Sequence, residues 1–290
     1  MGIGDYGPPV DQLLALGDLR GAGEWRDYHQ YGLGPEHVPD LIRMATDDEL
    51  DSADSESAEI WAPIHAWRAL GQLRAEEAVE PLLGQFQGLD DSDWFTEDMP
   101  AVFSLIGPAA IPALRAYLAD PGHGEWPKIT ATTSLTRIGQ DHQEARDDIA
   151  SALMGQLERF EHNGEALNAN FVVGLTELRA AEALPVIERA FAAGTVDRAV
   201  MGDWEDVQIE FGVKDARDTP RPNYVAEALG IEPDLPERLG ELVQLQPEGL
   251  PEPPPVAQPS ASQRRAAADR KAKSKRKTAK QSRRANRRRR

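Results

Sequence analysis

The chain of 290 residues contains no cysteine. Disulfide bridges, zinc–thiolate sites and thiol nucleophiles are therefore excluded. Aromatic residues make up only 6% of the sequence, and the apolar residues are mostly Ala and Leu. That composition favours helices packed closely through small side chains over a β-sandwich. Signatures of catalysis are also missing, because there is no GxSxG motif, no P-loop and no HExxH spacing among the six histidines.

Long apolar runs are absent too. No stretch approaches the roughly 20 apolar residues that a membrane helix requires, so we expect no membrane span. The opening MGIGDYGPPV has neither the basic region nor the apolar run of a secretory signal, and Tyr6 breaks the myristoylation pattern. We expect a cytoplasmic monomer that needs no cofactor and no metal.

What the sequence does have is a strong separation of charge. The whole chain carries a formal charge of −17, yet residues 264–290 hold fifteen Lys and Arg against one acid, a net charge of +14. Residues 1–263 therefore carry −31. Between the two regions, QPEGLPEPPPVAQPSAS has six prolines in seventeen residues and cannot continue a helix.

The basic segment is the clearest functional signal. Crowded positive charges repel one another at i,i+4, so we expect a disordered tail that binds RNA, a ribosome or DNA through phosphate contacts. It contains no aromatic residue for base stacking, which predicts weak sequence specificity. Two alternatives are a solubility extension without a specific partner and a tail that folds back on its own acidic body. The candidate nucleic-acid-binding residues are Lys271, Lys273, Lys275, Arg276, Lys277, Lys280, Arg283, Arg284, Arg287, Arg288, Arg289 and Arg290.

An internal repeat organises the acidic part. The stretch LGQLRAEEAVEPLLGQF aligns with LTELRAAEALPVIERAF at an offset of 105 residues, which places Leu73 on Leu178. Two weaker copies lie between them, with Ile106 and Ile138 at steps of 33 and 32 residues. Three steps over 105 residues give a mean period of 35. Periods of this size indicate a solenoid of helix pairs, in which each pair covers the apolar face of the next.

The pattern within each unit predicts two helices. Ile60, Ile64 and Trp67 recur at helical spacing and form one apolar stripe, which continues through Leu70 and Leu73. Proline stands at or near the start of the second helix, where a backbone N–H has no intrahelical partner. Those prolines are Pro81, Pro108, Pro112 and Pro185. Asp91, Ser92 and Asp93 are candidate N-caps for a helix that begins near Trp94.

These motifs resemble HEAT repeats of the variety found in phycobilisome-lyase-like proteins. The stretches GPEHVPDLIRMATDDEL and VMGDWEDVQIEFGVKDARDTPRPNY also resemble an uncharacterised bacterial family of HEAT-like proteins. The resemblance implies an all-α solenoid. We predict capping helices and an acidic linker over 1–57, four repeats over 58–199, a C-terminal capping region over 200–245, a Pro-rich linker over 246–263 and the basic tail over 264–290.

Two clusters are candidate protein-binding sites. Trp61, His65, Arg68 and Gln72 are spaced to share one helical stripe, and Trp and Arg are common hot-spot residues. The alternative interpretation is that Trp61 covers the edge of the core, His65 bonds locally and Arg68 faces water.

The second cluster is Asp203, Trp204, Asp206 and Glu210. Its carboxylates are candidates for binding a cation or a basic peptide, and the alternative is a capped helix with Asp203 at its N-terminus. A third acidic stretch, TDDELDSADSESAE, lacks the glycine of a calcium loop and is interpreted as a solvated linker.

The sequence therefore favours a non-enzymatic protein-interaction scaffold whose basic tail tethers it to RNA, a ribosome or DNA. One alternative is an enzyme or enzyme-accessory subunit resembling the bilin lyase subunits, which visible absorption by a bound bilin would reveal. A HEAT-like nucleic-acid enzyme is disfavoured, because Glu76, Glu77 and Glu80 make the second helices acidic.

Overall fold

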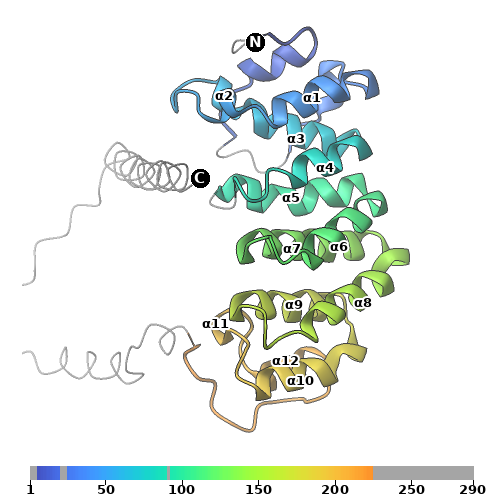
Figure 1. The fold of residues 1–290 in the computed structure, drawn as a ribbon, viewed down its shortest axis with the longest axis vertical. Coiled ribbons are helices and arrows are strands. Elements are labelled where there is room, and N and C mark those ends of the chain that lie inside the picture. Colours follow the sequence, from blue (N-terminus) through green and yellow to red (C-terminus); the bar gives the residue numbers. More distant parts are fainter. Residues whose placement is uncertain (1–4, 20–24, 90–91, 225–290) are drawn as a thin grey trace, which may run out of the picture. The chain divides into compact units, whose positions relative to one another are not determined.

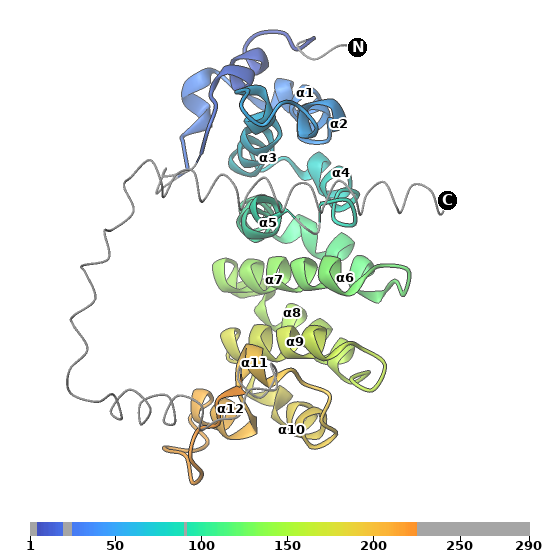
Figure 2. The same cartoon turned by 90° about the vertical axis from the view of Figure 1, so that its left-hand side faces the viewer.

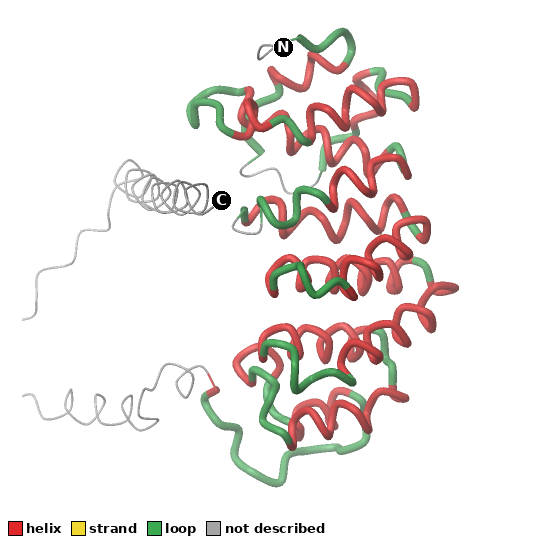
Figure 3. Tube along the Cα trace, viewed as in Figure 1, coloured by secondary structure: helices red, strands yellow, loops and turns green. Residues whose placement is uncertain are grey.

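The computed structural model describes residues 5–19, 25–89 and 92–224 (Figure 1). Within these ranges the chain forms twelve α-helices and no strand, which confirms the predicted all-α class (Figure 3). All described residues belong to the first of the two units into which the chain divides, Met1–Leu229 and Gly230–Arg290. The predicted Pro-rich linker and basic tail lie outside the described residues.

The α-helices follow one another in chain order from the blue to the orange end of Figure 1. They are α1 (Val38–Ala45), α2 (Asp48–Asp51), α3 (Ala62–Gln72), α4 (Val79–Leu83), α5 (Asp93–Ile106), α6 (Ile111–Ala119), α7 (Glu125–Asp141), α8 (Arg146–Leu157), α9 (Glu165–Glu177), α10 (Leu184–Ala192), α11 (Arg198–Met201) and α12 (Trp204–Glu210).

Short 3₁₀ helices mark the junctions. They are η1 (Val10–Ala15), η2 (Tyr28–Tyr31), η3 (Pro35–His37), η4 (Glu59–Trp61), η5 (Glu76–Ala78), η6 (Pro108–Ala110), η7 (Gln143–Ala145) and η8 (Ala181–Ala183). Each of the last four leads directly into a second helix and ends in a buried alanine, at position 78, 110, 145 or 183. These alanines are 32, 35 and 38 residues apart, so their mean spacing equals the period of 35 found in the sequence.

Two arginines show that the sequence alignment matches equivalent backbone positions. Arg74 and Arg179 follow the aligned residues Leu73 and Leu178, and their φ angles are +53° and +54°. They are the only non-glycine residues with positive φ in the described ranges. Left-handed backbone is unfavourable for a residue with a Cβ, so the same departure at an offset of 105 residues indicates the same turn in both units.

The helices contact one another in two rows. The first helices pack in the succession α1, α3, α5, α7 and α9, and the second helices pack in the succession α4, α6, α8 and α10 (Figures 1 and 2). Contacts of α6, α8 and η7 with α7, and of α8 with α9, join the rows. Each first helix is thus covered mainly by the first helices of the units before and after it.

Local signals explain where several helices begin. The Ser92 hydroxyl caps α5 by accepting a hydrogen bond from the Phe95 N–H, as expected for a serine before the first turn. Pro112 and Pro185 lie at the second positions of α6 and α10, and Pro81 lies in the first turn of α4. At such positions proline removes no intrahelical hydrogen bond.

Helix α3 differs from the prediction of a single apolar stripe. Every residue from Ala62 to Gly71 is buried. Helices α1 and α5 pack on it from two sides, and η1 and η2 of the N-terminal segment cover it further. A helix enclosed in this way must also bury its polar side chains, and each of them then needs a partner inside the molecule.

Candidate functional site

The first predicted site lies inside the molecule. Trp61, His65 and Arg68 are 8%, 0% and 5% exposed, and Gln72 is partly buried. The interpretation of these residues as a surface strip for recognition is therefore wrong. The alternative interpretation is wrong for Arg68, which does not face water, and for His65, whose partners Gly17 and Tyr28 are distant in the sequence. Its third part agrees with the structure, because Trp61 packs against the core.

Arg68 forms a buried ion pair with Asp98 of α5. Its Nε and Nη2 donate to the carboxylate at 2.6 and 2.9 Å, and Trp67 Nε1 donates to the same carboxylate at 3.0 Å. The guanidinium carbon also lies 4.8 Å from the centre of the Trp25 ring and 5.7 Å from that of Trp94. This two-point pairing joins two successive first helices, and the Trp25 contact links it to the N-terminal segment.

His65 and Gln72 hold the N-terminal segment against α3. The Gly17 carbonyl can only accept, so His65 Nε2–H donates to it at 2.9 Å, and the Tyr28 hydroxyl donates to Nδ1 at 2.7 Å. The Gln72 amide accepts from the Tyr28 N–H and donates to the Arg26 carbonyl, both at 2.8 Å. The stripe therefore recognises a segment of its own chain.

Burial determines the protonation states of His65 and Tyr28 in this contact. It lowers the pKa of His65 to about 4, although the hydrogen bond to Gly17 acts in the opposite direction. Burial also raises the pKa of Tyr28 above its usual value. Both groups are therefore neutral near pH 7, which matches the pattern of one donor and one acceptor on the imidazole.

The second predicted site is a helix N-terminus whose carboxylates are already paired. Asp203 caps α12 by accepting from the N–H groups of Glu205 and Asp206, as the alternative interpretation proposed. Arg217 donates from Nη1 and Nη2 to the two oxygens of Asp203 at 2.9 and 2.7 Å, and its Nη1 lies 2.8 Å from Asp206. The hydrogen bonds from Arg217 hold the pKa of Asp203 well below its usual range.

The loop after α12 supplies the remaining partners. Lys214 pairs with Glu205, whose pKa falls to about 2 mainly because of that contact. The Tyr224 hydroxyl donates to Asp206 at 2.9 Å. These carboxylates thus pair with basic side chains of their own chain.

The other two residues of the second site take no part in these ion pairs. The Trp204 ring is half-buried and packs against Phe191, with 6.3 Å between the ring centres. Glu210 is exposed, and its backbone carbonyl accepts from Arg179 Nη1 at 2.8 Å.

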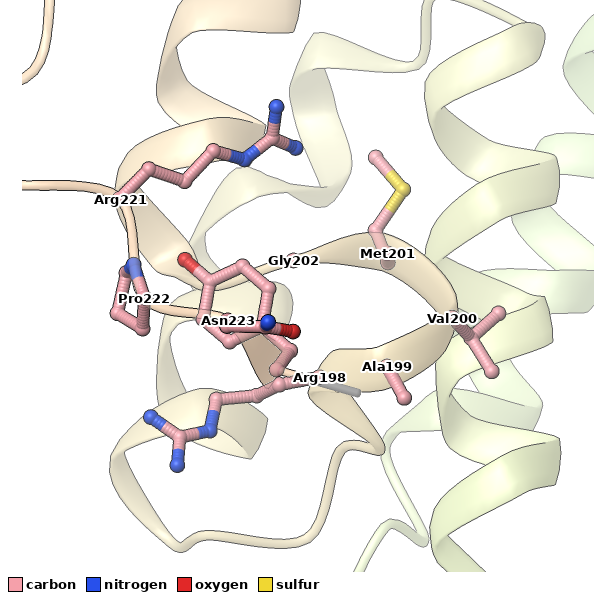
Figure 4. A pocket seen from close by; sticks show the side chains of 9 residues that line it. Arg198, Ala199, Val200, Met201, Gly202, Arg221, Pro222 and Asn223 are labelled. Atoms are coloured by element: carbon pink, nitrogen blue, oxygen red, sulfur yellow. The ribbon is translucent and has the colours of Figure 1, made fainter. Parts of the chain in front are cut away.

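A pocket of about 450 Å³ opens beside the cluster, between residues 198–202 and 221–224 (Figure 4). Arg198 and Arg221 both line it, but their side chains extend in opposite directions. Arg221 lies 3.6 Å from Asp206, and the Arg198 guanidinium lies 5.7 Å from the centre of the Tyr224 ring. The two guanidinium groups therefore do not converge on a common anion.

Comparison with known proteins identifies no relative of this chain. The chain matches no family model, no curated protein and no solved structure. Among the residues that the structure describes, no group of three or more His, Asp or Glu side chains is arranged to hold a metal ion. The predicted monomeric state, cytoplasmic location and absence of a cofactor stay predictions.

The sequence also predicted that the chain has no membrane span and that its basic tail binds nucleic acid. Within 5–19, 25–89 and 92–224, no single helix is long and apolar enough to cross a bilayer, although α5 and the segment Pro108–Ala119 pass that test as a pair bent by 111°. The twelve candidate nucleic-acid-binding residues from Lys271 to Arg290 lie outside the described residues.

Proposed function

We propose that the chain is a HEAT-like solenoid that binds another protein through its helical surface, and that its basic C-terminal segment attaches it to nucleic acid. The supporting observation is that polar contacts between successive layers recur at about one repeat length. These contacts are Arg68–Asp98, Ser104–Asp141, Arg115–Asp148, Gln140–Glu177, Arg146–Glu182 and Glu158–Arg189, separated by 30, 37, 33, 37, 36 and 31 residues.

This regular separation supports a fold in which each unit contacts only its neighbours. Such repeat proteins present a long continuous surface, and binding is their most frequent use. The resemblance of the packing motifs to HEAT repeats favours the same architecture. A protein partner is therefore the expected ligand of the helical part.

Charge favours different ligands for the two parts of the chain. The first 263 residues carry −31, and Glu76, Glu77 and Glu80 are exposed at the start of α4. Such a surface repels a phosphate backbone. Residues 264–290 carry +14 and attract it. Nucleic-acid contact is therefore assigned to the basic segment.

The test of this attachment is a salt titration of binding to labelled single-stranded RNA and to duplex DNA. If about half of the fifteen cations contact RNA, the slope of log affinity against log salt is about −5. A chain ending at Pro259 is the matched control, and we expect it to bind neither polymer. Equal binding by both chains, or no binding by the full chain, would reject the attachment.

A further inference from the structure

A groove of about 530 Å³ lies between α6 and α8. Small residues form much of its lining, namely Ala116, Ala119, Ser151, Ala152 and Gly155. Gly155 faces open space, since a Cβ atom at this position would meet no atom within 4 Å. Small side chains allow the backbone of another helix to approach closely, so the shape suits a helical ligand.

One end of the groove carries positive charge. Arg159 follows α8, lines the groove and is exposed. Lys128 lies in the first turn of α7. Burial lowers the pKa of the Lys128 ammonium group most, and the nearby charge of Arg159 lowers it further. Among the described residues, neither Lys128 nor Arg159 forms an ion pair.

Two cations at this end have no ion-pair partner among the described residues, namely Lys128 and Arg159. Arg115, which also lines the groove, is neutralised by Asp148 at 2.7 Å. Asp120 is the acid whose charge acts on Lys128. In a region of the chain, residues 1–263, that carries −31, unpaired cations select a negatively charged ligand.

The lining fits a ligand that has both an apolar face and carboxylates. Its small residues offer apolar contact, and Arg159 offers a cation. Arg is among the residues most often found at energetic hot spots of protein interfaces.

We propose that this groove binds an acidic α-helical segment of a protein partner. The apolar face of the segment lies between α6 and α8, and its carboxylates pair with Arg159 and Lys128. The inference rests on the proposed protein-binding function and names the surface and the chemical class of the partner.

The test is a selection from a displayed library of 16-residue peptides on the full chain. The library is first depleted on a synthetic peptide of residues 264–290, because acidic peptides also bind a basic tail. The Kd of each selected peptide is then measured for four variants of the full chain. Gly155→Phe fills the groove and Arg159→Glu reverses its charge. Gly155→Ala and Arg74→Glu are matched controls, the second at an exposed arginine that does not line the groove.

We expect the selected peptides to be acidic and to have apolar residues at i, i+3 and i+4. Gly155→Phe and Arg159→Glu should each weaken binding by about tenfold or more, equivalent to about 1.4 kcal/mol, whereas both controls stay within about twofold of the parent chain. Basic or neutral peptides, an empty selection, or peptides that bind Gly155→Phe as tightly as the parent would overturn the proposal. Binding unaffected by the groove variants would leave the scaffold function standing and place its surface elsewhere.

Discussion

Removing the carboxylate of Asp98 should lower the free energy of unfolding more than substituting any exposed residue does. Asp98→Ala leaves the Arg68 guanidinium, whose side chain is 6% exposed, as an uncompensated buried charge, and Trp67 Nε1–H loses its acceptor. Breaking one side of such a pair costs about 3–5 kcal/mol. With a urea m-value of about 2 kcal/mol per M, the midpoint falls by about 2 M.

The control is the double variant Arg68→Met/Asp98→Leu. Replacing a buried ion pair by apolar side chains is often neutral, so we expect most of the lost stability to return. A residual loss of about 1 kcal/mol remains, because Trp67 Nε1–H still has no acceptor. Urea unfolding followed by tryptophan fluorescence measures all three chains. A loss below about 1 kcal/mol for Asp98→Ala, or a double variant no more stable than the single one, would refute the reasoning.

Three further predictions address other contacts. The pKa of His65 is about 4 in the folded chain and 6.5 when unfolded, so the unfolded chain binds the proton first and stability falls as pH drops below about 6.5. Between pH 7 and pH 5 the loss is about 2 kcal/mol, and His65→Gln should lack this part of the pH dependence in urea titrations. Gly139→Ala should destabilise by about 1–2 kcal/mol, because its Cβ would lie 2.7 Å from Leu178 Cδ2, whereas Gly155→Ala should stabilise by up to about 1 kcal/mol; thermal melts compare them. Arg217→Ala should raise the pKa of Asp203 towards its usual value in an NMR carboxyl titration, and an unchanged pKa would contradict the pairing.

Much of the helical organisation was accessible from the sequence. The alignment of Leu73 with Leu178 identified equivalent backbone turns, because the packing residues of a repeat keep their spacing from unit to unit. Ser92 and the prolines at helix starts marked boundaries because capping depends on residues only a few positions apart. Asp203 was also recognised as a helix cap from its local context.

The error at α3 has a long-range cause. Periodicity distinguishes two sides of a helix, but it does not show that Gly17, η1 and η2 cover the second side of this one. The partner of Arg68 is 30 residues away, and Arg217 is 14 residues from the carboxylate that it pairs with. The groove beside Arg159 also arises only when two second helices pack side by side. Its signal in the sequence was the small residues of those helices.

The most direct test of the account is simultaneous binding of the two proposed ligands. Single-stranded RNA is immobilised, the full chain is added, and retention of a fluorescent acidic peptide from the groove selection is measured. The account predicts retention by the full chain, affinity for the retained peptide weakened by about tenfold or more in Gly155→Phe, and no retention by a chain ending at Pro259. If RNA instead displaces the peptide from the full chain, both ligands share the basic segment, and a scaffold that joins a protein partner to nucleic acid is contradicted.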